Sequence, residues 1–85
     1  MHEYLDTFTC WEELKRLDQL SIHIDEYRFI LENFISTYDF ELARLETEMS
    51  SGCLHPKIAN ELYHTKIDYD ALLAILYLRL SEISF

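Results

Sequence analysis

The amino-acid sequence predicts an all-α fold, either an antiparallel helical hairpin or a small three- to four-helix bundle, with its turn between Ser50 and Pro56. Hydrophobic residues make up 49% of the 85 positions, well above the level of disordered chains. The chain contains one Gly and one Pro, which leaves almost no turn-forming residues for a β fold. At this length, residues 1–85 have room for a single helical domain.

The first helical segment is predicted to begin near Trp11. The run Thr9-Cys10-Trp11-Glu12 has the S/T-x-x-E form of a capping box. Apolar residues then recur every three positions as far as Leu20, which is shorter than the helical period, and the spacing changes after that residue. This change predicts a kink or short turn within residues 18–22, with Ser21 available to cap the next helix.

Residues 20–49 are predicted to form a helix with one core-facing stripe. The apolar positions of the stripe average about 3.6 residues apart, the period of a straight α-helix. The stripe comprises Leu20, Ile24, Tyr27, Leu31, Phe34, Tyr38, Leu42, Leu45 and Met49. A weak break at Ser36-Thr37-Tyr38-Asp39, where two poor helix formers precede an acid, stays open at this point.

A second helical arm is predicted from about Pro56 onward, because Pro suits the first turn of a helix and Gly52 suits the end of the preceding one. Its apolar stripe is interrupted by Lys66, next to Thr65. Either one continuous helix or a break between residues 64 and 68 fits this pattern. The stripe comprises Ile58, Leu62, Tyr69, Leu72, Leu73, Leu76, Leu80 and Ile83.

Apolar residues outside these stripes are the candidate partner-binding residues. On a helical wheel, Ile22, Phe29 and Phe40 lie nearly opposite the stripe of residues 20–49. Residues 71–78 carry no charge at any angle, and a helix that is apolar on all sides is normally buried. From that run, the candidates are Ile75, Tyr77 and Leu78. A neighbouring helix, a second copy of the chain or a partner protein is expected to cover these residues.

The charge of the chain restricts its partners. Sixteen acidic and seven basic residues give a formal net charge of -9, which repels phosphate backbones and anionic membrane surfaces. Every cation has an acid three or four positions away on a helical reading, so no basic patch is expected. The expected pairs are Glu12 with Lys15 and Arg16, Asp25 and Glu32 with Arg28, Glu41 and Glu48 with Arg44, Lys57 with Glu61, Lys66 with Asp70, and Arg79 with Glu82. We expect a protein partner with a neutral or basic surface, and neither nucleic acid nor membrane as a direct partner.

The sequence contains no pattern that predicts catalysis, a cofactor or a metal site. Glu61-Leu-Tyr-His64 has the Glu-x-x-His spacing of helical di-metal sites, but such sites need a second pair. Cys10 and Cys53 have neither CxxC nor zinc-finger spacing, so two free thiols are expected. His55 follows Cys53 in the turn, and adjacency in sequence does not make a catalytic dyad. We expect no enzyme activity.

The N-terminal residues lack the positive segment and apolar run of a signal peptide. The longest nearly apolar stretch, residues 71–80, is about half of what a membrane-spanning helix needs. We therefore expect a cytoplasmic protein. Three functions fit: a self-associating, dimer-forming adaptor, regulator or inhibitor that docks an apolar and aromatic helical face on a protein; an acidic nucleic-acid mimic that inhibits a DNA- or RNA-binding enzyme; or a structural oligomer subunit.

Overall fold

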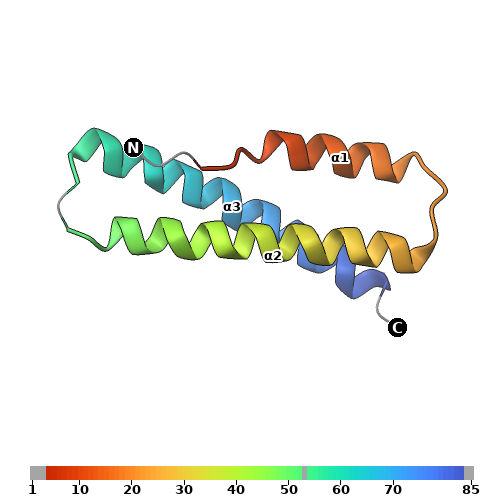
Figure 1. Ribbon diagram of the computed structural model, residues 1–85. Coiled ribbons are helices and arrows are strands. Elements are labelled where there is room, and N and C mark those ends of the chain that lie inside the picture. The colour runs from red at the N-terminus through yellow and green to blue at the C-terminus, as the bar shows by residue number, and fades with distance from the viewer. Residues whose placement is uncertain (1–3, 53, 84–85) are drawn as a thin grey trace.

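In a computed structural model, the described residues, 4–52 and 54–83, form three α-helices and no strand (Figure 1). Helix α1 spans Phe8–Asp18, α2 spans Ile24–Met49 and α3 spans Pro56–Ile83. The prediction of an all-α fold is confirmed. Gly52, in the connection between α2 and α3, has a φ of 78°, a left-handed conformation that glycine adopts without a steric cost.

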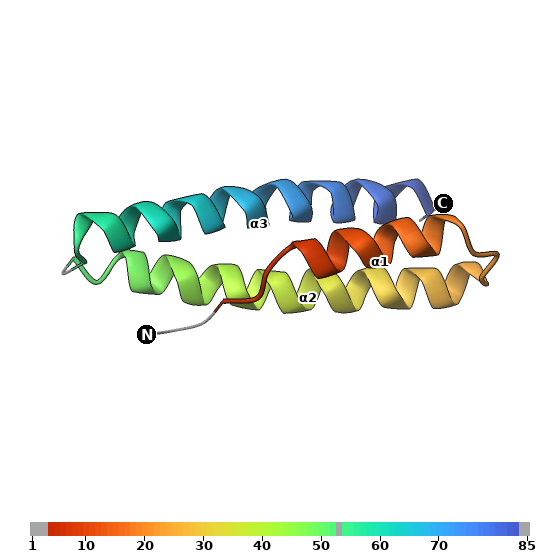
Figure 2. The same ribbon diagram turned by 90° about the horizontal axis from the view of Figure 1, so that it is seen from above.

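The helices differ in length, and this difference shapes the molecule. Helices α2 and α3 contain 26 and 28 residues and run antiparallel, whereas α1 contains 11 residues. Helix α1 therefore lies beside only the half of the α2–α3 hairpin formed by the start of α2 and the end of α3 (Figure 2). The other half is flanked by residues 4–7, which precede α1 and are called the N-terminal strap below.

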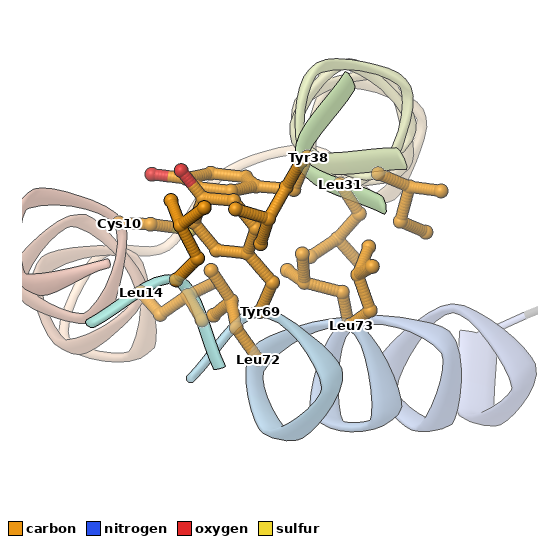
Figure 3. Packing of buried hydrophobic residues seen from close by; sticks show 11 residues of the cluster. Cys10, Leu14, Leu31, Tyr38, Tyr69, Leu72 and Leu73 are labelled. Atoms are coloured by element: carbon orange, nitrogen blue, oxygen red, sulfur yellow. The ribbon is translucent and has the colours of Figure 1, made fainter. Parts of the chain in front are cut away.

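The core lies where the three helices meet. Figure 3 shows Cys10 and Leu14 of α1 pointing toward the rings of Tyr38 and Tyr69, which come from α2 and α3. These two rings pack edge to face with their centroids 5.4 Å apart. The buried apolar side chains of the core cluster are Cys10, Leu14, Leu31, Ile35, Tyr38, Leu45, Leu62, Tyr69, Leu72, Leu73 and Leu76. Each fully buried leucine contributes about 1.5–3 kcal/mol relative to an exposed one.

Helix α1 begins three residues earlier than predicted, at Phe8 rather than Trp11. The Thr9 side chain does not cap the helix. It donates a 3.2 Å hydrogen bond to the Asp6 carboxylate, which also accepts the Thr9 backbone N–H at 2.9 Å. An acid just before the first turn thus accepts the Thr9 N–H, whereas the capping-box pattern has the Thr9 hydroxyl accept the Glu12 N–H.

The turn predicted within residues 18–22 is confirmed, because α1 ends at Asp18 and α2 begins at Ile24. The cap of α2 is His23 rather than the predicted Ser21. The His23 Nδ1 accepts the backbone N–H of Asp25 at 3.2 Å. An imidazole acceptor thus takes the place of a hydroxyl at this helix start.

Neither of the two weak breaks forms. Helix α2 continues through residues 36–39, and α3 continues through residues 64–68. In α3, the Thr65 hydroxyl donates to the Glu61 carbonyl oxygen at 3.1 Å, and the Lys66 ammonium contacts the Asp70 carboxylate at 2.9 Å. Bonding within one helix therefore accommodates the polar residues that interrupt the apolar stripe.

Two core tyrosines hold the N-terminal strap against the hairpin. The Tyr69 hydroxyl donates to the Leu5 carbonyl oxygen at 2.5 Å, and the Tyr38 hydroxyl donates to the Asp6 carbonyl oxygen at 2.7 Å. Both tyrosines are buried. These bonds satisfy the polar ends of two large core side chains and fix the position of the strap.

An ion pair joins the end of α1 to α3. The Arg79 guanidinium donates to both Asp18 carboxylate oxygens, at 2.6 and 3.1 Å, and to the Tyr27 hydroxyl at 3.0 Å. The sequence-based pairing of Arg79 with Glu82 is therefore wrong. Its true partner lies 61 positions earlier in the chain, where helical spacing gives no information.

Replacing Arg79 with alanine is expected to destabilise the protein by about 0.5–1 kcal/mol, a value that allows for the solvent around Asp18. Hydrogen bonding to Arg79 lowers the pKa of the Asp18 carboxyl below its ordinary value. The stabilisation by this pair is therefore complete above the unfolded-state pKa of about 4 and is lost as the pH falls through the folded-state pKa.

Urea denaturation at neutral and acidic pH checks this prediction. The Arg79→Ala variant should lose less stability on acidification than the parent protein does. Lys66→Ala, which breaks the pair within α3, is the matched control and should change stability by about 0.2–0.5 kcal/mol. An unchanged difference between the two pH values in Arg79→Ala would contradict the assigned role of Asp18.

Candidate protein-binding surfaces

One exposed surface follows α2 on the side turned away from the core and is called the outer α2 face. Its residues are spaced alternately four and three positions apart, the spacing of the seam of a coiled coil. All of them are exposed and uncharged: Phe29, Asn33, Ser36, Phe40, Ala43 and Thr47. The two phenylalanines are 65% and 66% exposed. This face has the geometry to receive a second helix.

Acidic residues border one edge of the outer α2 face. Glu32, Asp39 and Glu46 are exposed and follow each other at intervals of seven residues. The opposite edge carries Thr37 and Arg44, and the Arg44 guanidinium contacts the buried Glu41 carboxylate at 3.2 Å. The face therefore presents an uncharged centre with two exposed phenylalanines and one negatively charged edge.

A second exposed surface, the outer α3 face, consists of Tyr63, Ile67, Ala71, Ala74 and Leu78. Within a single chain, residues 71–78 are covered on one side only, so a second copy of the chain or a partner protein stays open as the cover of the other side. Leu72, Leu73 and Leu76 are buried, whereas Ala71, Ala74 and Leu78 are exposed. Helices α1 and α2 cover one side of α3 and leave the other side open.

The structure does not bring the six candidate residues together on one surface. Phe29 and Phe40 lie on the outer α2 face and Leu78 on the outer α3 face. Tyr77 is half exposed between the two long helices, where its hydroxyl donates to the Asp39 carboxylate at 2.7 Å.

The other two candidates are partly covered. Ile22 is half-buried in the connection between α1 and α2. Ile75 is half-buried and lines a shallow hollow beside Asp18 and Tyr27, where the end of α1 approaches α3. Both are therefore less accessible to a partner than Phe29, Phe40 and Leu78.

A groove runs between the N-terminal strap and the first half of α3, and it has a volume of about 720 Å³. Sequence analysis missed it. Its apolar lining comes from Leu5, Phe8, Leu54, Ile58, Leu62 and Tyr69. Four of its described lining residues are acidic, namely Asp6, Glu48, Glu61 and Asp68, and none is Lys or Arg.

Tyr4 lies in the wall of the groove that the N-terminal strap forms. Its hydroxyl donates to the Glu48 carboxylate, and the Arg44 guanidinium lies 5.0 Å from the centroid of its ring. Burial raises the pKa of Tyr4 to about 12, and the bond to Glu48 acts in the same direction. Tyr4 is therefore a neutral hydrogen-bond donor at physiological pH.

The groove was missed for two reasons. Leu5 and Phe8 precede the predicted helix start, so they were not assigned to any face. Ile58 was placed in the core stripe of the second arm, but it is exposed at the groove. The one available signal was the clustering of Tyr4, Leu5 and Phe8 before the first helix.

The side chains that could bind a metal ion or take part in catalysis do not lie close together. Glu61 lines the groove, whereas the His64 ring packs edge to face with Tyr63, its centroid 6.3 Å away. Among residues 4–52 and 54–83, no group of three or more His, Cys, Asp or Glu side chains is arranged to hold a metal ion. Cys10 is a free thiol, and burial raises its pKa to about 11, which keeps it unreactive. Cys53 lies outside the described residues.

The chain matches no family model, and no curated protein or solved structure is similar to it. None of the described helices has an apolar stretch long enough to cross a membrane. The function must therefore be inferred from the exposed surfaces themselves.

Proposed function

We propose that this protein is an adaptor, regulator or inhibitor that binds one helix of a partner protein on the outer α2 face. The observation that supports this most is the uncharged, coiled-coil-spaced row of exposed residues with Phe29 and Phe40 about two-thirds exposed. Burying a phenylalanine fully contributes about 1.5–3 kcal/mol, and aromatic anchors carry much of the energy of protein interfaces.

The acidic border supports a partner helix that carries Lys or Arg. Cations beside the apolar seam of such a helix would face Glu32, Asp39 and Glu46. Two copies of this chain would fit less well, because antiparallel pairing sets these acids against each other. Parallel pairing offers one cation, Arg44, which already contacts Glu41. A foreign helix is thus the better occupant of this face.

Self-association as a dimer is a second candidate function, and the outer α3 face favours it. This face is free of charge across its centre, and Ala71 and Ala74 lie between the larger Ile67 and Leu78. Small residues in the middle of a helix face allow two helices to approach closely. In a symmetric dimer, Leu78 of each copy would contact the outer α3 face of the other copy.

The proposal is tested by isolating a partner with the full chain, identifying it and measuring its affinity as a purified protein. Phe29→Asp and Phe40→Asp should each weaken binding at least tenfold, because each places a charge where a ring is buried. Leu78→Asp is the matched control on the other face and should leave binding unchanged. Unchanged affinity in both phenylalanine variants would overturn the proposal.

The salt dependence of the same interaction distinguishes docking on the outer α2 face from the alternative of an acidic nucleic-acid mimic. Binding that falls steeply between low and high salt but is indifferent to Phe40→Asp would favour the acidic nucleic-acid mimic. Sedimentation at micromolar concentration tests self-association. A dimer that dissociates in Leu78→Asp supports the outer α3 face, whereas a monomeric parent protein excludes it.

A further inference from the structure

The groove arises because α1 is too short to cover the whole hairpin. A chain of 11 helical residues reaches about 16 Å, whereas the 26 residues of α2 reach about 39 Å. The N-terminal strap lies beside the remaining half but does not fill it. The volume of about 720 Å³ falls within the range of about 300–1,000 Å³ typical of ligand-binding clefts.

The floor and one wall of this groove are held in place by the core. Leu62 and Tyr69 are buried at its base, and the bond from Tyr69 to the Leu5 carbonyl oxygen positions the strap. Leu5 and Ile58 remain exposed toward the opening. A preformed apolar site costs little conformational entropy on binding.

The charged groups of the groove indicate the chemistry of its occupant. Asp6 is bonded to Thr9 and Glu48 to Tyr4, but within the described part of the chain no side-chain hydrogen bond or ion pair engages Glu61 or Asp68. These two carboxylates lie seven residues apart on the α3 wall, about 10 Å along the helix axis.

We infer that this groove is a second binding site, separate from the outer α2 face, and that it receives an apolar segment of a partner protein flanked by Lys or Arg. A bulky aliphatic or aromatic side chain contacts Ile58 and Leu62. A neighbouring cation pairs with Glu61 or Asp68, and such charge-assisted bonds are about twice as strong as neutral ones. A second copy of this chain is a poor source of that cation, since its net charge is -9.

Selection from a peptide-display library on the 85-residue chain provides the probe for this site. Enriched peptides should combine a bulky apolar residue with a nearby Lys or Arg. The strongest selected peptide is then synthesised with a fluorescent label, together with a matched peptide in which every Lys and Arg is Glu. The parent peptide should bind at least tenfold more tightly than the charge-reversed one.

Variants of the protein assign that binding to the groove. Ile58→Asp and Glu61→Lys should each weaken binding of the labelled peptide at least tenfold. Phe40→Asp, on the outer α2 face, should leave the affinity for this peptide within twofold of that of the parent protein. Circular dichroism checks that each variant is folded, and Glu61→Gln, which keeps the size of the side chain, should weaken binding in the same direction.

Three results would overturn the inference. They are the absence of enriched peptides, enrichment without basic residues, and a loss of binding in Phe40→Asp but not in Ile58→Asp or Glu61→Gln. The last result would place the peptide on the outer α2 face and so support the proposed function while removing the groove. Binding lost only in the groove variants leaves the outer α2 face to be tested on its own.

Discussion

Replacing Leu72 with alanine is expected to lower the free energy of unfolding by about 2–5 kcal/mol. Leu72 has no exposed surface and lies in the core cluster between the helices. The substitution removes buried apolar atoms and leaves a cavity that the surrounding helices fill only in part. Native proteins have total stabilities of about 5–15 kcal/mol, so this loss is a large fraction of the total.

Leu78→Ala is the matched control, since it makes the same chemical change in the same helix at a side chain that is 55% exposed. Its cost should be within about 0.5 kcal/mol. Urea denaturation followed by circular dichroism measures both variants. Equal losses at the two positions would contradict the orientation of α3, because that orientation alone distinguishes Leu72 from Leu78.

Raising the pH above about 10 is expected to unfold the protein through ionisation of its buried tyrosines. Burial raises the pKa of Tyr38 to about 12 and that of Tyr69 further still, and the nearby Glu41 carboxylate acts in the same direction on both. Tyr4 in the groove wall is shifted upward as well. Each of these groups resists ionisation only while the chain is folded.

The sign follows from the direction of these shifts. A tyrosine whose pKa is higher in the folded than in the unfolded state stabilises the fold fully below the unfolded-state pKa of about 10. That stabilisation is lost as the pH rises toward the folded-state value, by about 1.4 kcal/mol per pH unit for each group. Two or three tyrosines ionising together would remove several kcal/mol between about pH 10 and 12.

Tyr69→Phe and Tyr38→Phe test this account. Each variant loses the hydrogen bond to the N-terminal strap, which should cost about 1 kcal/mol at neutral pH. Each should also show a weaker dependence of stability on pH above about 10, since one shifted group has been removed. Tyr63→Phe, at an exposed position, serves as the control. Identical alkaline transitions in the parent protein and both core variants would exclude buried tyrosine ionisation as the cause.

Local signals in the sequence predicted the helical segments well. The change of apolar spacing after Leu20 corresponds to the turn between α1 and α2, and Gly52 and Pro56 bracket the turn before α3. The predictions failed where a local pattern had two solutions. Thr9 formed an apparent capping box, but Asp6 is the acceptor that the helix start uses.

The predicted core stripes were right in their centres and at their C-terminal ends, where Met49 and Ile83 pack against the core, and wrong at their N-terminal ends. Leu31 and Leu45 are buried, whereas Leu20, Ile24 and Ile58 are exposed. A stripe shows which face of a helix turns inward, but it does not show how far a neighbouring helix extends along that face. The groove left open by the short α1 accounts for Ile58, whereas Leu20 and Ile24 lie at the turn between α1 and α2.

The six predicted binding residues were also only partly as expected. Phe29, Phe40 and Leu78 are exposed as expected of surplus apolar surface, but they lie on two different faces. Ile22 and Ile75 are half-buried, and Ile75 lines a hollow beside Asp18 at the end of α1. A helical wheel ranks positions around one helix and carries no information about the helices beside it.

By itself, the sequence determined the helical character of the chain, its acidity and the position of Phe29 and Phe40 opposite the core stripe, because each of these depends on composition or on residues within a few turns of one another. Only the tertiary structure decided the contacts of Tyr69 with Leu5 and of Arg79 with Asp18, which join residues 64 and 61 positions apart. It also decided the groove, which exists because helices of unequal length pack side by side. Such contacts depend on how the helices are placed relative to each other, and no periodicity along a single helix records that placement.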